Sequence, residues 1–154
     1  MNLVLKYLLS ITFICLTEIA SANVVISKVV DNPYEDVRSN LIDAIEEKAL
    51  NISKIYHASN MLNRTKDSVK NAENIYQKAE IIEFCSAKIS HQLVLANHLN
   101  ITSCPFKIAL YSLTKSPEQI HIIYTQLKPI DKASIKPSAE ANELIESLVE
   151  SAAW

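Results

Sequence analysis

Glycine is missing from this chain of 154 residues. Loops that hold phosphate groups against the backbone depend on glycine, because its lack of a Cβ atom permits conformations that other residues avoid. The sequence therefore excludes a glycine-rich nucleotide-binding loop. It also lacks the Gly-x-Ser-x-Gly turn that exposes the nucleophile of many serine hydrolases, so that enzyme class has almost no support.

An excess of positive charge is lacking as well. The chain carries 15 lysines and arginines against 17 aspartates and glutamates. Proteins that bind nucleic acid or an anionic membrane surface do so through a basic patch that attracts phosphate groups. Nearly balanced charges give no such patch, and we expect no nucleic-acid partner.

Cysteines are few and widely spaced. The three are Cys15, Cys85 and Cys104. No two of them have the Cys-x-x-Cys spacing of thioredoxin-like redox proteins, and the ligand spacing of zinc fingers and zinc ribbons is absent too. A chain of this kind gives no recognisable redox or metal motif, although individual cysteines remain candidates.

Long apolar runs are absent, with one short exception near the N-terminus. The run Tyr7–Leu16 follows a single positive charge, Lys6, and it is shorter than the roughly 20 residues that a membrane span needs. Ala20, Ser21 and Ala22 then supply the small-x-small pattern that a signal peptidase requires. We therefore predict a secretory signal peptide, and the alternative is a retained anchor.

The predicted cleavage site divides the chain into a signal peptide over residues 1–22 and a single domain over residues 23–154. A domain of this length is long enough to bury a hydrophobic core. We expect it to reside in the periplasm or outside the cell, with no membrane contact after cleavage.

The first half of the domain contains two predicted strands around one helix. Residues 24–30 are β-branched and short, which predicts a strand. Residues 33–49 have apolar side chains at spacings of three and four, which predicts an amphipathic helix. A second strand is predicted over residues 52–58, and the polar stretch 61–74 is predicted to be a loop with one or two helical turns.

The second half begins with a strand, a helix and a hairpin. Residues 79–84 predict a strand, and Ser86 is placed to cap a helix that runs to residue 97. Strands over 106–113 and 120–127 are predicted to form a hairpin through the connection 114–119. Both hairpin strands are more continuously apolar than a half-exposed edge strand would be.

A last helix is predicted to start at Pro137, after a connection over residues 130–136. The complete order is β-α-β-β-α-β-β-α. This order predicts an α+β fold of two layers, in which helices cover one face of a mostly antiparallel sheet.

The strand that ends Glu83-Phe84-Cys85, the following helix with His91, the Cys104-Pro105 start of a strand and the closing hairpin and helix together resemble a known family. It is the family called domain of unknown function 302, and the resemblance covers roughly residues 24–149. The resemblance implies a compact α+β fold related in outline to the TATA-binding-protein fold. It also implies a homodimer, and it implies no established reaction.

Cys85 and Cys104 carry the chemistry that the sequence offers, and three interpretations remain open. The first is a structural disulfide. The helix between the cysteines carries the chain roughly 18 Å away at 1.5 Å per residue. The seven residues that follow it span at most about 25 Å, so the chain can return and a bridge is permitted.

The second interpretation is a reactive thiol, because Cys85 directly precedes a helix N-terminus that favours a thiolate. The third is a metal site in which His91 and Glu83 join the two cysteines, since thiolate and imidazole ligands suit zinc or copper. A buried cysteine that acts as a small apolar residue is the plain alternative to both. The cofactor, if any, is unknown.

Two functional classes follow from these residues. The first is a non-enzymatic module that binds a small ligand, a metal or a protein partner. The second is a thiol-dependent redox or sulfur-handling enzyme that uses Cys85 and Cys104. We favour the first, because a base, a nearby resolving cysteine and a cofactor loop are all missing. No catalytic residue is assigned, and neither the ligand nor the protein partner is identified.

Overall fold

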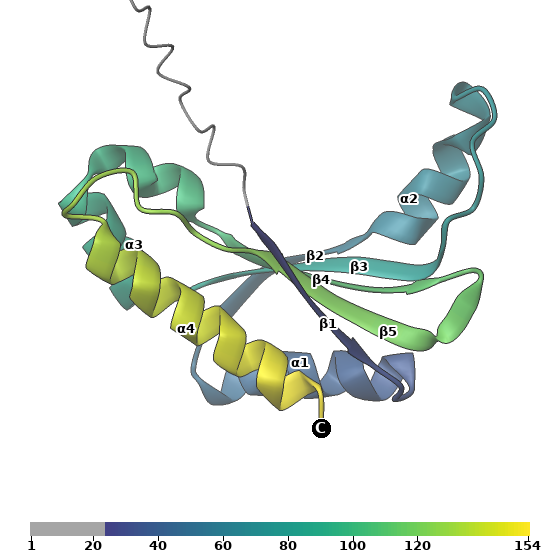
Figure 1. Ribbon diagram of the computed structural model, residues 1–154, viewed down its shortest axis with the longest axis horizontal. Coiled ribbons are helices and arrows are strands. Elements are labelled where there is room, and N and C mark those ends of the chain that lie inside the picture. The colour runs from purple at the N-terminus through teal and green to yellow at the C-terminus, as the bar shows by residue number, and fades with distance from the viewer. Residues whose placement is uncertain (1–23) are drawn as a thin grey trace, which may run out of the picture.

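Five antiparallel strands form a single sheet in the order β1-β5-β4-β3-β2 (Figure 1). The structure is a computed structural model, and it describes residues 24–154. The strands are β1 (Val25–Val30), β2 (Asn51–His57), β3 (Tyr76–Cys85), β4 (Phe106–Leu113) and β5 (Ser116–Thr125). Four α-helices accompany them: α1 (Tyr34–Glu47), α2 (Ala58–Thr65), α3 (Ala87–Ala96) and α4 (Ile135–Ala152). Two short 3₁₀ helices, η1 (Lys66–Ser68) and η2 (His98–Ser103), follow α2 and α3.

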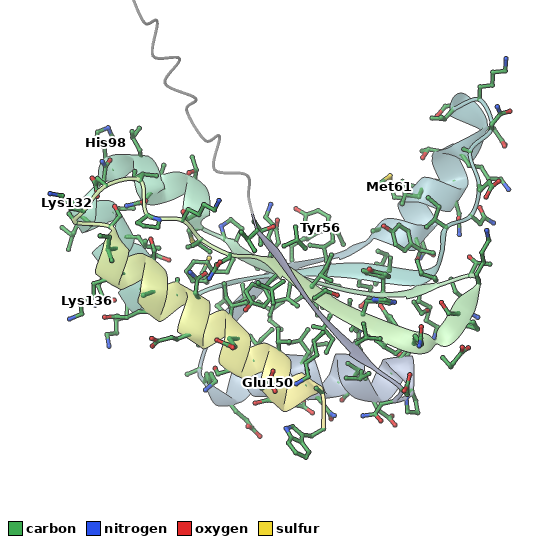
Figure 2. The ribbon with its side chains drawn as sticks, viewed as in Figure 1. Tyr56, Met61, His98, Lys132, Lys136 and Glu150 are labelled. Atoms are coloured by element: carbon green, nitrogen blue, oxygen red, sulfur yellow. The ribbon has the colours of Figure 1, made fainter. Side chains whose placement is uncertain are left out.

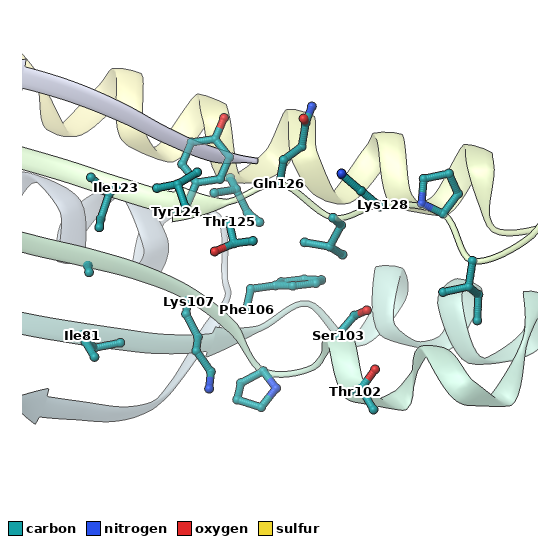
Figure 3. A pocket seen from close by; sticks show the side chains of 17 residues that line it. Ile81, Thr102, Ser103, Phe106, Lys107, Ile123, Tyr124, Thr125, Gln126 and Lys128 are labelled. Carbon is teal, nitrogen blue, oxygen red and sulfur yellow. The ribbon is translucent and has the colours of Figure 1, made fainter. Parts of the chain in front are cut away.

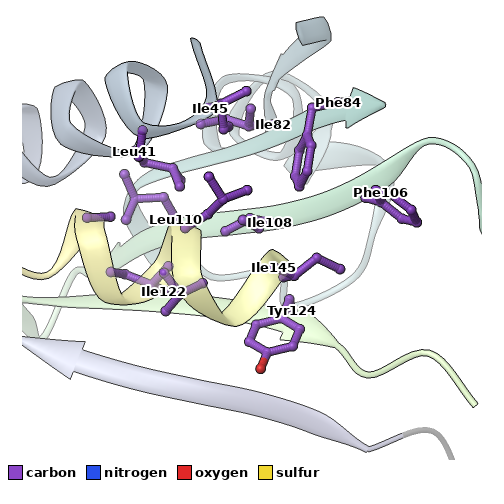
Figure 4. Close-up of a cluster of buried hydrophobic side chains, with 14 of the residues drawn as sticks. Leu41, Ile45, Ile82, Phe84, Phe106, Ile108, Leu110, Ile122, Tyr124 and Ile145 are labelled. Carbon is purple, nitrogen blue, oxygen red and sulfur yellow. The ribbon is translucent and has the colours of Figure 1, made fainter. Parts of the chain in front are cut away.

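One face of the sheet, called the covered face here, lies against α1 and α4, which pack side by side beneath it (Figure 1). Alternate residues of the central strands point into this layer, because side chains alternate between the two faces of a strand. Ile82, Ile108 and Ile122 lie there with no exposed surface. Figure 4 shows them meeting Leu41 of α1 and Ile145 of α4.

The helices contribute matching apolar stripes. In α1 the buried positions recur at spacings of three and four, as an amphipathic helix requires: they are Tyr34, Val37, Leu41, Ala44 and Ile45. In α4 they include Ala141, Ile145, Leu148, Val149 and Ala152. Full burial of one large aliphatic side chain contributes about 1.5–3 kcal/mol, so this layer supplies the main driving force for folding.

A charged group also lies within the covered face. Glu80 of β3 accepts a hydrogen bond from Nε of Arg38 at 2.6 Å, and its other carboxylate oxygen lies 2.7 Å from Nδ1 of His57. The Glu80 side chain is only 12% exposed. A carboxylate removed from water in this way needs its partners, so α1, β2 and β3 are held together at this point.

The helix α2 differs from the others because none of its residues is buried. It leaves β2 and rises on the side of the sheet opposite α1 and α4 (Figure 1). Tyr56 and Met61 lie on that same side (Figure 2), and each exposes 46% of its surface. The segment from α2 through η1 is called the arm below.

Two turns use backbone conformations that usually belong to glycine. Ala49 has a φ angle of 54° and Asn71 one of 61°, in the left-handed region. Asparagine visits this region readily, whereas an alanine there costs roughly 1–2 kcal/mol. The lack of glycine therefore places a small strain at the end of α1.

Most of the predicted elements are confirmed, including the α+β class and the helices on one sheet face. Ser86 caps α3 as predicted, since its hydroxyl accepts from the backbone N–H of Ile89. Three predictions were wrong in detail. The segment 61–74 was predicted to be a loop with one or two helical turns, and the helix α2 is present there, but it starts at Ala58, which the prediction placed in the preceding strand. The others concern β5 and α4.

The strand β5 begins at Ser116, so the hairpin connection is shorter than predicted. Pro117 is tolerated because the ladder with β4 ends at Ser116 and the ladder with β1 begins at Ile120, which leaves its missing N–H unneeded. The helix α4 starts at Ile135 rather than Pro137. Pro137 still lies in its first turn, where backbone N–H groups have no helical partner.

Candidate functional site

The face of the sheet turned away from α1 and α4, called the open face here, is lined by half-buried apolar side chains. Ile81, Ala109 and Ile123 lie opposite one another on β3, β4 and β5. Each is partly exposed, whereas the neighbouring Ile82, Ile108 and Ile122 are fully buried on the other face. The strands are therefore apolar on both faces, although helices cover only one.

A cleft of about 790 Å³ lies at one end of this open face. The pairing of β4 with β5 ends at Ile108 and Tyr124, so the segments beyond, around Phe106 and Gln126, face each other across a gap (Figure 3). The apolar lining comes from the strands, and Thr102, Ser103, Lys107 and Gln126 add polar groups. Pockets of this volume that combine an apolar wall with a few polar groups commonly bind small molecules.

Hydrogen bonds hold both walls of this open-face cleft. On one side, the side chain of Asn142 in α4 accepts from the N–H of Leu127 at 2.8 Å and donates to its carbonyl oxygen at 2.9 Å. On the other, the buried Asn100 of η2 donates to the Leu93 carbonyl and to the Ser134 hydroxyl. The segments that line the cleft are thus fixed to α3 and α4.

Asp131 extends this support. Its carboxylate accepts hydrogen bonds from Asn97 and from the side chain and backbone of Ser134. These bonds, the one from Asn97 first, lower the pKa of Asp131 below its usual value. The start of η2 and the start of α4 are therefore linked by one polar network.

The two cysteines meet beside the cleft. The Sγ atoms of Cys85 and Cys104 lie 3.0 Å apart, and both residues are partly buried. Ser103 and Pro105, the neighbours of Cys104, line the cleft, and the Cys104–Pro105 peptide bond is cis. The sequence permitted this approach, and the structure shows it.

Burial raises the pKa of the Cys85 thiol to about 11, and the contact with Cys104 and the negative charge of Glu83 act in the same direction. A thiol of this kind is protonated at neutral pH, so it is a weak nucleophile there. Desolvation therefore outweighs the effect of the α3 N-terminus that the reactive-thiol interpretation invokes.

Glu83 and His91 are placed differently from the cysteine pair. Glu83 shares the open face and pairs with Nζ of Lys107 at 3.2 Å. His91 is exposed on α3. In the part of the chain that the structure describes, no three histidine, cysteine or acidic side chains gather to hold a metal ion. The geometry therefore gives the metal interpretation no support.

The aromatic side chains of the hairpin divide between the two faces. Tyr124 is buried, and it also lines the cleft. Tyr111 lies on the open face, where its ring stacks on that of His121 with centroids 4.6 Å apart and meets Tyr76 edge to face. Burial raises the pKa of Tyr111, which therefore stays neutral at physiological pH.

Comparison with known proteins bears directly on this arrangement of strands and helices. The sequence profile of the domain of unknown function DUF302 matches residues 26–152. The chain belongs to the DUF302 family. No curated protein matches the chain.

The fold is that of a solved DUF302 protein. The crystal structure of the uncharacterized conserved protein DUF302 from Bacillus stearothermophilus superposes with a TM-score of 0.67 at 12% sequence identity. The match covers 83% of this chain and 97% of that one. At such low identity the likeness establishes the DUF302 fold and no activity.

Among residues 24–154, no helix is long and apolar enough to span a membrane.

The sequence identified the two cysteines as candidates but did not predict the cleft. A sign of the second apolar face was present in β4 and β5, where apolar residues occupy the positions that point to either face of the sheet. That pattern indicates a second apolar face. The cleft itself depends on where β4 and β5 separate, which no local pattern in this sequence encodes.

Proposed function

We propose that this DUF302 protein is an exported, non-enzymatic module that binds a small amphipathic molecule in the open-face cleft. The observation that carries the proposal is the cleft itself, a cavity of about 790 Å³ with an apolar floor on the sheet face that α1 and α4 leave uncovered. Its apolar floor suits a hydrocarbon or aromatic body. The hydroxyl, amide and ammonium groups at its margin suit a polar end.

The floor of the cleft offers a direct test. Ala109 lines the cleft between Ile81 and Ile123 of the neighbouring strands, so Ala109→Trp puts a large side chain into the cavity without removing any polar group. The probe is anilinonaphthalene sulfonate, an aromatic anion, titrated against the native protein by fluorescence. We expect Ala109→Trp to weaken its binding by at least about tenfold, which is the loss of a well-packed contact worth about 1.4 kcal/mol.

The matched control is Ala133→Trp, which adds the same side chain at an exposed position outside the cleft. It should leave the affinity unchanged. Both variants must unfold cooperatively, because a loosened core binds this dye nonspecifically. Equal binding by Ala109→Trp and the unsubstituted protein would overturn the proposal.

A thiol-dependent enzyme is the second candidate, because the Sγ atoms of Cys85 and Cys104 lie 3.0 Å apart. The raised pKa of Cys85 opposes it, since an attacking cysteine needs a thiolate near neutral pH. Alkylation by iodoacetamide at pH 7 separates the two functions. We expect labelling slower than that of a free cysteine, and rapid labelling of Cys85 would favour the enzyme.

The proposal also includes export of the protein and formation of a homodimer. The support for export is the signal-peptide pattern of the sequence, which lies outside the described residues. The support for a homodimer is the family resemblance together with exposed apolar side chains on the arm side of the open face, where Tyr56, Met61 and Leu62 each expose more than 40% of their surface. Light scattering of the purified protein tests pairing, and a monomer would refute it.

A further inference from the structure

The two cysteines are brought together by strand pairing rather than by the chain between them. Phe84 of β3 lies opposite Phe106 of β4. Cys85 follows Phe84 directly, and Cys104 precedes Phe106 by two residues. Both thiols therefore emerge at the same end of the sheet. The contact rests on the best-paired part of the fold, because β3 and β4 are its central strands.

This position is suited to covalent chemistry between the two sulfur atoms. Both side chains are partly exposed, so a small disulfide in solution can reach them. In the described part of the chain no third cysteine is present to compete for either one. Cys104 also lies between two cleft residues, Ser103 and Pro105, so this end of the cleft provides access from solvent.

We infer that Cys85 and Cys104 are a reversible cross-linking site that closes into an intramolecular disulfide when the protein meets a low-molecular-weight disulfide. A thiolate of the pair attacks the oxidant, and one thiol leaves. The second cysteine then loses its proton, attacks the mixed disulfide and displaces the other thiol. Two protein thiols are oxidised and one external disulfide is reduced to two thiols, so atoms and electrons balance.

The inference does not depend on the proposed ligand. It needs only two sulfur atoms that the fold holds within reach of each other, whereas the binding function needs an accessible cleft. Mass and labelling measurements therefore test the cross-link whether or not the cleft binds anything.

The experiment uses the full chain with Cys15→Ser, which leaves Cys85 and Cys104 as its cysteines. The protein is equilibrated with mixtures of reduced and oxidised glutathione, quenched with acid and alkylated after unfolding. We expect a single oxidised species that is lighter by two hydrogen atoms and takes up no label. We also expect the native protein to be at least about tenfold more oxidised than the urea-unfolded chain at the same glutathione ratio.

Two matched variants show whether one thiol alone behaves in the same way. In Cys104→Ser and in Cys85→Ser no partner can displace the glutathione, so each chain should retain one glutathione adduct. If the protein with both cysteines also stops at glutathione adducts, the inference is wrong. It is equally wrong if the chains link to one another, or if both thiols remain free at every ratio.

Discussion

The two faces of the sheet are formed by the same strands but differ in how deeply their apolar side chains are buried. On the covered face, Ile82, Ile108 and Ile122 are fully buried beneath α1 and α4. On the open face, their neighbours Ile81, Ala109 and Ile123 are apolar as well, yet they remain partly exposed around a cleft. A folded domain gains little by keeping a second apolar face uncovered. The difference shows that the covered face carries most of the stability, and it supports the proposal that the open face binds a ligand.

The largest expected difference comes from two adjacent isoleucines of β5. Ile122→Ala removes a fully buried side chain from the covered face and should lower the free energy of unfolding by about 2–5 kcal/mol. Ile123→Ala removes the same atoms from the open face and should cost about 1 kcal/mol. Urea unfolding of both variants measures the two losses. Equal losses would mean that something covers the open face in solution.

The cross-link would add stability from the open side. A disulfide between Cys85 and Cys104 closes a loop of about 20 residues, which should stabilise the protein by about 3 kcal/mol through the entropy of the unfolded chain. The measurement compares the urea midpoints of the oxidised and the reduced protein. The Cys85→Ser variant is the control, since it cannot close the loop and should not gain this stability in the presence of oxidant. Identical midpoints for the two states of the unsubstituted protein would contradict this expectation.

Two glutamates of β3, one on each face of the sheet, allow the stabilising effect of a charged side chain to be compared between the faces. Glu80 and Glu83 have almost equal side-chain exposure, 12% and 13%, and each has a cationic partner. Glu80 lies against α1 with two close partners, so Glu80→Gln should cost about 2 kcal/mol by leaving the Arg38 charge poorly compensated. Glu83→Gln breaks one longer contact to a more exposed lysine and should cost less than about 1 kcal/mol. Thermal unfolding at low salt measures both, and a larger loss for Glu83→Gln would reverse the assignment of the faces.

The smallest expected effect is a loss of stability of the reduced protein at alkaline pH. The pKa of Cys85 is raised by burial from 9.0 to about 11, so between these values the unfolded chain releases a proton that the native protein retains. Stability should therefore fall as pH rises from 9 to 11, and below pH 9 this group should have no effect. Because the thiol is partly solvated, we expect a loss of about 1 kcal/mol at most.

The control for the pH measurement is Cys85→Ser, in which this part of the slope should vanish. Tyr34 contributes a slope of its own above pH 10, because burial raises its pKa too, and this contribution cancels between the two proteins. Urea unfolding at pH 8 and pH 10 gives the difference. A slope that is equal in both proteins would show that Cys85 is more solvated than the structure indicates.

Much of the fold could be predicted from local sequence because the buried side of a helix or strand requires apolar residues at a regular spacing. The helices over 34–47 and 135–152 carry stripes at helical spacing, and these matched the buried positions. The arm was predicted only in part, as one or two helical turns within a loop, because its side chains are mostly polar and none is buried. Its position depends on packing against β3, which a local pattern does not contain.

The candidate site was only half predictable for a similar reason. Chain length showed that Cys104 could return to Cys85, but the actual contact follows from the antiparallel pairing of Phe84 with Phe106. The same two cysteines in a parallel crossover would lie far apart. The cleft depends on where the pairing of β4 and β5 stops, at Ile108 and Tyr124, and this is a property of the whole sheet.

The position of β1 has a consequence for the order in which the domain can be completed. As an edge strand, β1 pairs with β5, with Val25 opposite Thr125. A chain that leaves the ribosome N-terminus first must therefore wait for almost the whole domain before its first strand finds a partner. Contacts between residues so distant in sequence form slowly, because closing the long loop costs entropy first. Of the five strands, β1 is synthesised first but can pair only after β5 has emerged, so the sheet stays incomplete until synthesis of the domain is nearly finished.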